Sequence, residues 1–335
     1  MSTDLISMAR SGDSDAFRAL IEPHRRELRV HCYRMLGSVQ DAEDALQETM
    51  LDAWRGLAGF EERASVRTWL YRIATHRCLD ARRSASRRPA KHWDVPMVDP
   101  IQPTGFGEVP WLEPFPDTYL TGAFGTESSP AAHVEQVEAV SLAFVTALQT
   151  LPPRQVAVLI LRDVLGFHAD EVAVMLGCTL DSANSALKRA RAGLQARFPT
   201  DLGRPAAPAG GSAAEQEVVD RFVKAWEAAD VDALVDLLSD DVFMSMPPIP
   251  FEYSGRDIVA AFCANLFAAG RRFDLVPTRA NGQPAFGAYL RPRAGLRHGT
   301  GLYVLALAGD QISAMTRFET SVMPWFGLPP YLPSQ

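Results

Sequence analysis

The sequence lacks long apolar runs, closely spaced cysteines and, over one extended stretch, any basic residue. Its longest apolar run, around residues 137–148, is interrupted by Glu138 and Ser141 and is too short to span a bilayer. The N-terminus carries acidic residues early and has no apolar signal core. These features predict a soluble chain without a signal peptide, and we expect it in the cytoplasm.

The cysteines give no sign of a metal site or of a disulfide framework. There are four of them, far apart and without a CxxC pair: Cys32, Cys78, Cys178 and Cys263. A zinc site would need closer ligands, and disulfides would need partners that this spacing does not suggest. We expect reduced thiols, most of them buried in helices, and no bound metal or cofactor.

Charge is distributed unevenly along the chain. The net charge is −7, but residues 95–137 hold no Lys or Arg and six acids, and basic residues cluster on both sides of that strip. The clusters are Arg82, Arg83, Arg87, Arg88 and Lys91, and then Lys188, Arg189, Arg191 and Arg197. Two local cationic patches thus flank an acidic strip, and this pattern is more informative about partners than the net charge.

Composition and length predict several globular domains. The chain has 335 residues, 47% of them hydrophobic and 22% charged, which is close to the globular average but too long for one core. Helical periodicity dominates residues 4–90, a Pro- and Gly-rich stretch occupies 95–130, helices resume near 134, and a second linker ends near 212. The last 120 residues open with a helical pattern over Val218–Leu238 and continue as strands. Turn signals at Asn281-Gly282 and Gly309-Asp310 predict β-hairpins there.

Two amphipathic helices stand out in the first segment. The stretch DAEDALQETMLDAWRGL has an apolar face and an acidic face, with Ser38 as its expected N-cap. After a loop over residues 59–65, a second helix contains Trp69 on its apolar face and basic residues on its others. The acidic face is most simply a solvated surface, and Trp69 at helical spacing is more often core than a stacking platform.

Residues 151–197 predict a helix-turn-helix. Leu151-Pro152-Pro153 sets a helix start, Gly177 ends the helix over residues 167–176, and Thr179 can cap the next one. In such a motif the first part of the second helix faces base edges, and later basic residues face phosphates. An ordinary helical hairpin with a basic, solvated end is the alternative reading.

Taken together, these segments resemble a known family. The stretch DAEDALQETMLDAW…GFEERASVRTWLYRIATHRCLDARR resembles region 2 of the extracytoplasmic-function group of bacterial sigma factors, and LPPRQVAVLILRDVLGFHADEVAVMLGCTLDSANSALKRARAGL resembles their region 4. The resemblance implies two all-α modules, a region 2 helical bundle and a region 4 helix-turn-helix. It also implies that the acidic linker follows the polymerase between them.

The resemblance assigns roles to residues of this sequence. It implies that core RNA polymerase binds Asp41, Glu43, Asp44, Gln47 and Glu48. It implies that the −10 element, with a flipped base, is bound by Phe60, Arg63, Ser65, Arg67, Trp69, Arg72, His76 and Arg77. It implies that the −35 element is read by Ser182, Asn184, Ser185, Lys188, Arg189 and Arg191.

Three positions depart from the family pattern. His76 stands where many relatives have Asn, Asn184 and Ala186 stand where Lys and Arg are usual, and His168 replaces a Ser or Thr cap. These departures affect the expected preferences at the −10 and −35 elements.

The C-terminal stretch resembles a SnoaL-like domain, a cone-shaped α+β fold. The resemblance is carried by VVDRFVKAWEAADVDALVDLLSDDVFMSMPP and HGTGLYVLALAGDQISAMTRFET, and WLEP at residues 111–114 resembles a linker motif of sigma factors with this appendage. We expect the cone domain to pack on region 2 or on the linker, with Trp111 and Leu112 as anchors. A small-molecule pocket would be lined by Phe222, Trp226, Met246 and Tyr253.

Catalysis by the cone domain is the less favoured reading. Its candidate acid–base residues are Asp241, His298 and Asp310, but Asp310 lies in an expected turn and Asp241 at an expected helix end. We therefore expect a regulatory domain and no catalytic residue.

The sequence thus predicts an RNA polymerase sigma factor whose activity is adjusted by its own C-terminal domain. Its partners would be the polymerase core, promoter DNA and, in the cone domain, a small-molecule ligand. The expected domains are region 2 at 4–94, a linker at 95–133, region 4 at 134–198, a linker at 199–212 and the SnoaL-like domain at 213–335. The alternative is a helix-turn-helix repressor or sensor that carries a ligand-binding or catalytic cone domain.

Overall fold

The computed structural model describes residues 2–85, 90–93, 95, 98–109, 111–121, 136–197, 204–292 and 295–333. The chain divides into two compact units, and the linker is shared between them. Unit 1 contains residues 1–87 and 118–200, and unit 2 contains residues 88–117 and 201–335. Within the described residues, no helix is long and apolar enough to cross a membrane.

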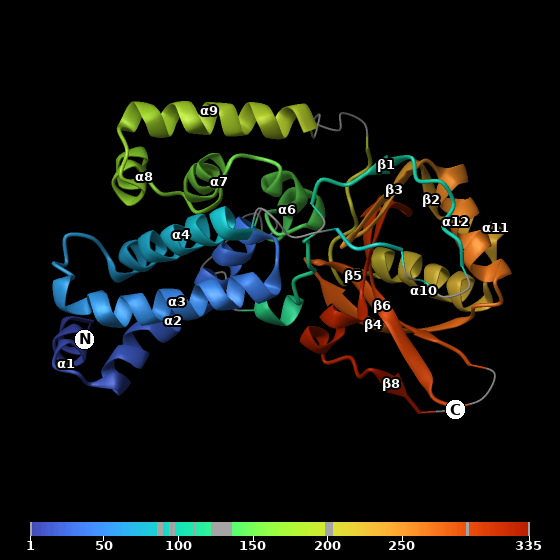
Figure 1. The fold of residues 1–335 in the computed structure, drawn as a ribbon, viewed down its shortest axis with the longest axis horizontal. Coiled ribbons are helices and arrows are strands. Elements are labelled where there is room, and N and C mark those ends of the chain that lie inside the picture. The colour runs from blue at the N-terminus through green and yellow to red at the C-terminus, as the bar shows by residue number, and fades with distance from the viewer. Residues whose placement is uncertain are drawn as a thin grey trace. The chain divides into compact units, whose positions relative to one another are not determined.

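Unit 1 is built only from helices in its described part, and its first half is a bundle (Figure 1). The bundle consists of α1 (Ser2–Arg10), α2 (Ser14–Leu36), α3 (Val39–Gly56), the short η1 (Leu57–Gly59) and α4 (Val66–Ala85). Ser38 caps α3 as expected, since its hydroxyl accepts from the Asp41 amide at 3.1 Å. Gly37 ends α2 in the left-handed region at φ 72°, which any other residue would adopt only with strain.

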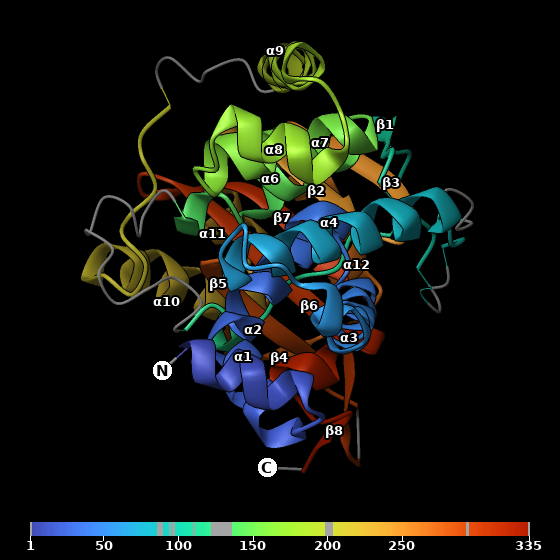
Figure 2. The ribbon, with the colours of Figure 1, turned by 90° about the vertical axis from the view of Figure 1, so that its left-hand side faces the viewer.

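The second half of unit 1 confirms the helix-turn-helix. Helices α6 (Leu142–Gln149), α7 (Pro153–Leu159) and η3 (Ile160–Val164) precede α8 (Ala169–Leu176) and α9 (Leu180–Arg197). Gly177 lies at φ 59° between α8 and α9, and Thr179 Oγ1 accepts from the Ser182 amide at 3.2 Å. Figure 2 shows α9 end-on, with α6, α7 and α8 beneath it.

Unit 2 is an α+β domain in which helices pack on one curved sheet. Helices α10 (Ala213–Ala228), α11 (Val231–Val235) and α12 (Arg256–Ala268) contribute to a single buried cluster with the sheet. The strands are β1 (Gly105–Phe106), β2 (Leu238–Met246), β3 (Ile249–Ser254), β4 (Phe273–Ala280), β5 (Gln283–Leu290), β6 (Arg297–Ala308), β7 (Gln311–Phe318) and β8 (Tyr331–Leu332). Their order is β1-β3-β2-β7-β6-β5-β4, with β8 on β6, and only the β2–β7 pairing is parallel.

Both hairpins expected from the turn signals are present. Asn281 and Gly282, at φ 58° and 74°, join β4 to β5, and Gly309-Asp310 joins β6 to β7. The helix expected over Val218–Leu238 is present as two helices, α10 and α11, and it ends before Leu238, where β2 begins. Ala229 ends α10 in the left-handed region, α11 is a single short turn, and Asp241 lies in β2 and not at a helix end. The apolar pattern continues across the break because Leu234 of α11 and Leu238 at the start of β2 are buried in the same core cluster.

The described residues of the linker pack against one or the other of the two units. Residues 98–109 and 111–117 lie within unit 2, β1 adds to the edge of β3, and Val98 belongs to the buried cluster of the cone domain. Residues 118–121 belong to unit 1, where the Thr121 carbonyl accepts from Arg26 at 2.9 Å.

Candidate nucleic-acid interface

The loop ahead of α4 places two aromatic rings together. Ser65 caps α4, with its hydroxyl accepting from the Thr68 amide at 3.0 Å, and this fixes the first turn that carries Trp69. Phe60, at the other end of the loop, stacks on Trp69 with centroids 4.7 Å apart and planes at 30°. The buried Phe60 therefore holds the partly exposed indole at the rim of the loop.

A hollow of about 570 Å³ opens beside these rings. One side comes from the loop and α4, with aromatic, cationic and hydroxyl groups: Phe60, Arg63, Ser65, Thr68, Trp69 and Arg72. The other side comes from α8, which contributes Asp170, Glu171, Val174 and Met175. Aromatic surface with nearby guanidinium groups suits an unpaired base and its phosphate. The carboxylates of α8, Asp170 and Glu171, would instead attract a cationic group.

The residues predicted to bind the −10 element fall into two groups. Arg63, Ser65, Arg72 and His76 are exposed, whereas Arg67 and Arg77 are partly buried and paired within unit 1. Arg67 Nε donates to Glu27 Oε2 at 2.9 Å and lies over the rings of Tyr71 and Phe167. Arg77 pairs with Asp52 and, at 3.6 Å, with Glu48.

The charge of the Glu27 cluster is fixed by its neighbours. Burial alone would raise the pKa of Glu27, but hydrogen bonds from His24 and Arg67 outweigh burial and lower it. The pKa of the Tyr71 phenol is raised by burial and by the Glu27 carboxylate, to which its hydroxyl donates at 3.1 Å. The cluster ties α2 to α4 and orients the basic face of α4.

The acidic helix α3 presents only part of its predicted face. Asp44, Gln47 and Glu48 are exposed and Asp41 is partly exposed. Glu43 differs from the expectation, because it forms an ion pair with Arg29 in which both side chains are mostly covered. Glu43 lies on the side of α3 that faces α2, and its carboxylate therefore pairs with the Arg29 guanidinium of that helix.

The helix-turn-helix presents the predicted polar residues at the start of α9. Ser182, Asn184 and Ser185 are exposed, and Ala183 and Ala186 face inward. A groove of about 490 Å³ follows, lined by Arg162, Asn184, Leu187, Lys188, Arg191, Ala192 and Gln195. Arg191 makes two hydrogen bonds to Asp163, at 2.7 and 2.8 Å, and Asp163 raises its pKa. Lys188 and Arg189 are exposed.

His168 at the N-cap of α8 destabilises the helix less than its residue type suggests. Its amide donates to Glu171 Oε2 at 2.8 Å, so the third residue of the helix satisfies the N-cap backbone. This is half of a capping box, and it offsets the missing Ser or Thr.

The two modules of unit 1 pack against each other through cationic side chains. Arg34 of α2 is buried and donates to the Ala139 carbonyl at 2.9 Å and to the Gln136 carbonyl at 3.0 Å. Arg82 of α4 donates to the carbonyls of Gln149, at 3.2 Å, and Leu151, at 3.1 Å. Burial lowers the pKa of each guanidinium to about 10.

Part of the predicted −10 face takes part in this packing. His76 Nε2 donates to the Met175 carbonyl at 2.8 Å, and the Tyr71 and Phe167 rings meet edge to face at 5.4 Å. Sequence reasoning placed Arg82 on a basic surface and gave Arg34 no role. The sequence held a signal for Arg34, which is flanked by hydrophobic residues in the run CYRML.

In unit 2 the four residues predicted to line a ligand pocket all belong to the buried core cluster: Phe222, Trp226, Met246 and Tyr253. The Trp226 ring contacts Phe222 at 5.5 Å and Tyr303 at 5.0 Å, so these side chains pack on one another. The ligand pocket stays a prediction.

The three candidate acid–base residues are separated. Asp241 is exposed on β2 and pairs with Arg204, His298 packs on Tyr331 at 5.1 Å, and Asp310 lies in the β6–β7 turn. Across the described parts of the chain, no group of three His, Cys, Asp or Glu could hold a metal ion. All four cysteines are free, and three of them are buried.

Comparison with protein families gives three matches along the chain. Sigma-70 region 2 matches residues 20–88, sigma-70 region 4 matches residues 141–194, and a SnoaL-like domain matches residues 219–314. The matches follow the same order as the helical bundle, the helix-turn-helix and the cone domain.

Individual relatives match all or part of this arrangement. The chain is 43% identical over 326 residues to the ECF RNA polymerase sigma factor SigG of Mycobacterium tuberculosis, covering 96% of this chain and 85% of that protein. It is 32% identical over 221 residues to SigJ of the same organism, covering 66% of this chain and 62% of that protein. The crystal structure of SigJ shares the fold at a TM-score of 0.57 and 22% identity, covering 93% of this chain and 99% of that one.

Proposed function

Since the chain belongs to the ECF RNA polymerase sigma factors, we propose that it directs promoter-specific initiation through the residues described above. Region 2, residues 4–94, binds the polymerase core and opens the −10 element. Region 4, residues 134–198, binds the −35 element. The SnoaL-like domain adjusts this activity and performs no catalysis. A sigma factor acts where polymerase and promoters meet, in the cytoplasm.

One observation carries the proposal, which is the hollow beside Phe60 and Trp69. A flipped base needs an apolar surface on which to stack, and its backbone needs nearby positive charge. Stacked rings with Arg63 and Arg72 in the same wall supply both. A repressor needs no site for an unpaired base, so this hollow favours a sigma factor over the alternative.

Polymerase binding is assigned to the exposed acids of α3. Asp44 and Glu48 lie one turn apart on the exposed face, and Asp41 is partly exposed on the turn before them. Such a row complements a basic partner helix, and charged pairs of this kind govern association. Glu43 contributes indirectly, through its pair with Arg29.

Reading of the −35 element is assigned to the start of α9. Asn184 can form paired hydrogen bonds with an adenine edge, and the hydroxyls of Ser182 and Ser185 can donate to or accept from a base edge. Lys188, Arg189 and Arg191 follow where the phosphates of the duplex would lie. Asn184 and Lys188 line the same groove, so base reading and phosphate binding are adjacent.

The packing within unit 1 corresponds to a resting state. The −35 and −10 elements are about 25 base pairs apart, or ~85 Å along the duplex. His76 of region 2 is within hydrogen-bond distance of Met175 of region 4. The two modules must therefore separate before both elements are bound, and the acids of α8 then leave the hollow.

Multi-round transcription with purified polymerase core and a genomic DNA library tests the proposal. We expect the full chain to yield specific transcripts and the Trp69→Ala variant to yield ~100-fold fewer, because the stacking platform is lost. Tyr331→Ala, at an exposed aromatic residue of unit 2 outside the linker, is the matched control and should transcribe normally. Absence of specific transcripts from the folded full chain would refute the proposed function.

A further inference from the structure

The described part of the linker is bound by the cone domain at three places. We call residues 91–117 the strap. The first contact is aromatic, because Trp93 lies parallel to Phe251, with centroids 6.1 Å apart, and edge-on to Phe262 at 6.2 Å. Val98 is buried in the core cluster of the same domain, 7% exposed. In addition, the Tyr253 hydroxyl of the cone domain donates to the Ile101 carbonyl of the strap at 3.2 Å.

The second contact is strand addition. Residues 105–106 form β1 and pair antiparallel with β3, with Gly105 opposite Glu252 and Phe106 opposite Phe251. Thr104 N donates to the Glu252 carbonyl at 2.9 Å, and Gly107 N donates to the Pro250 carbonyl at 2.7 Å. An extended peptide that completes a sheet edge is a recurring mode of peptide recognition.

The third contact is a clasp at the β4–β5 hairpin. The buried Phe115 amide donates to Asn281 Oδ1 at 2.7 Å, and the Asn281 amide donates to the Phe115 carbonyl at 2.8 Å. Asn281 is 1% exposed and lies at φ 58°, which asparagine tolerates better than most residues. The hairpin turn thus presents both a donor and an acceptor to the strap.

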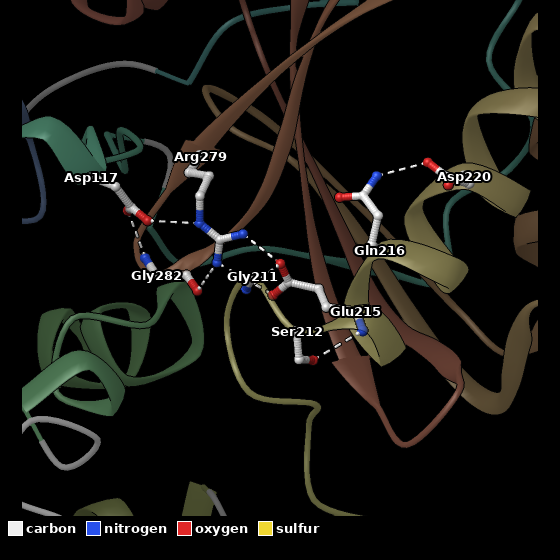
Figure 3. Close-up of polar contacts among 8 residues, drawn as sticks. All are labelled: Asp117, Gly211, Ser212, Glu215, Gln216, Asp220, Arg279 and Gly282. Atoms are coloured by element: carbon white, nitrogen blue, oxygen red, sulfur yellow. Dashed lines mark hydrogen bonds and ion pairs between the residues drawn. The ribbon is translucent and has the colours of Figure 1, made fainter. Parts of the chain in front are cut away.

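Charged groups complete the clasp (Figure 3). Asp117 accepts from the Gly282 amide at 2.8 Å and from Arg279 Nε at 3.3 Å. The same guanidinium donates to both carboxylate oxygens of Glu215 on α10, at 2.5 and 3.3 Å. Arg279 therefore joins the strap, the sheet and the first helix of the cone domain.

We propose that the SnoaL-like domain is a peptide-binding domain whose ligand is the linker of its own chain. The ligand is an extended peptide that supplies Trp93 and Val98 to the core, a short strand to β3, and Phe115 and Asp117 to the hairpin. This proposal rests on the proposed function, because it makes the strap the element that regulation acts on. Trp111 and Leu112, the anchors expected from sequence, lie within the strap, but Trp93, Phe115 and Asp117 make the contacts described.

Docking of the strap opposes separation of the two DNA-binding modules. The strap is part of the one covalent connection between region 2 and region 4, and its 27 residues, 91–117, could extend over ~90 Å. That reach is comparable to the ~85 Å between the promoter elements. While Val98 and Phe115 are buried in the cone domain, the strap cannot follow another surface. Polymerase and the cone domain therefore compete for the same peptide.

A reversible disulfide across β1 and β3 tests the proposal in the full chain. Phe106→Cys with Phe251→Cys places two thiols on directly opposed residues, within the Cα separation that a disulfide accepts. The matched control is Ala308→Cys with Gln311→Cys, which crosses the β6–β7 hairpin and leaves the strap free. Both pairs are made in a Cys178→Ser background, since the other three native thiols are buried.

We expect the oxidised strap variant to make at least 10-fold fewer specific transcripts than the same protein after reduction. The control pair should be insensitive to oxidation. Equal transcription by the oxidised and reduced strap variant would overturn the proposal, and so would failure of the Phe106/Phe251 thiols to cross-link. Failure of the proposed function gives a different result, because then the reduced and unmodified proteins also make no specific transcript.

A release variant tests the opposite direction. Asn281→Gly keeps the positive φ of the turn and removes the acceptor for the Phe115 amide. Loss of one buried hydrogen bond should raise the undocked population, and with it the transcript yield, about 5-fold. Hydrogen exchange at the Thr104 and Gly107 amides should accelerate by the same factor. Unchanged exchange and unchanged transcription in this variant would contradict docking by the clasp.

Discussion

In unit 1, the contacts between the region 2 and region 4 modules are made by cationic side chains that donate to carbonyl oxygens. The strap of unit 2 is held instead by backbone pairing and buried aromatic rings. Arg34 and Arg82 carry the first kind of contact, and burial lowers the pKa of both to about 10. A buried guanidinium regains hydration when such an interface opens, which offsets the hydrogen bonds it loses. The strap instead exposes Val98 and Phe115 when it leaves. Unit 1 is thus the easier of the two to open, and the strap is the stronger restraint.

The largest effect is expected when charge reversal on the acidic face of α3 in unit 1 is compared with charge reversal on α10 in unit 2. Replacing Asp44 and Glu48 with Lys should weaken core polymerase binding at least 100-fold, because it reverses the charge of the exposed face of α3. The matched control is Glu217→Lys with Asp220→Lys on α10, an exposed acidic pair in the cone domain. Both proteins should keep their circular dichroism spectra. Normal core binding by the α3 variant would contradict the assignment of that face.

A substitution at Arg82 and a control substitution at an exposed ion pair test the contacts between the two modules of unit 1. Arg82→Ala should lower the free energy of unfolding of unit 1 by about 2–4 kcal/mol, because it leaves the Gln149 and Leu151 carbonyls without their donor. Arg18→Ala, the control, removes an exposed ion pair with Asp15 and should cost about 0.5 kcal/mol or less. Urea titrations of both variants measure the difference. Equal values for the two would show that Arg82 does not hold the modules together.

Acid should distinguish the units because a neutral histidine is buried in unit 1 alone among the described residues. His31 is 0% exposed, its Nε2 donates to Thr75 Oγ1 at 2.9 Å, and burial and Arg34 lower its pKa to about 3. The unfolded state, with an ordinary histidine pKa of about 6.5, therefore takes up the proton first as the pH falls. The stabilisation is complete above pH 6.5 and is lost progressively toward pH 3, at about 2 kcal/mol by pH 5.

Urea titrations between pH 7 and pH 5 check this pH dependence. The variant His31→Gln should lose the His31 component of the slope while remaining less stable at pH 7. A slope that is unchanged in the variant would rule out His31 as its source.

The smallest expected effect concerns the start of α9. Asn184→Ala should cost about 1–3 kcal/mol of discrimination at one base pair of the −35 element, because Asn184 is assigned to a base edge. Lys188→Ala should weaken binding to all sequences and reduce the salt slope by about 1. Binding titrations against single-base variants of a selected promoter compare the two. Uniform weakening by Asn184→Ala would assign it to the backbone instead.

The sequence alone predicted what local chemistry decides. Helix capping by Ser38, the turn at Gly177 and the hairpins at Asn281 and Gly309 follow from residue types at fixed offsets, and the structure has all of them. It did not predict contacts between segments distant in the sequence. The pairing of Asp117 with Arg279, 162 residues apart, has no local signature, and neither has the donation of Arg34 to carbonyls near residue 139. The sequence therefore predicted that the cone domain packs on region 2 or on the linker, but not that Phe115 and Asp117 of the linker bind the β4–β5 hairpin.

The distance between the two modules of unit 1 tests the resting state most directly. Spin labels at Arg55→Cys and Arg154→Cys occupy exposed positions in region 2 and region 4, in the Cys178→Ser background. We expect one short distance in the free chain, and a shift of several tens of ångströms on adding polymerase core and promoter DNA. An unchanged distance in a complex that makes specific transcripts would contradict the account that region 2 and region 4 separate in order to work.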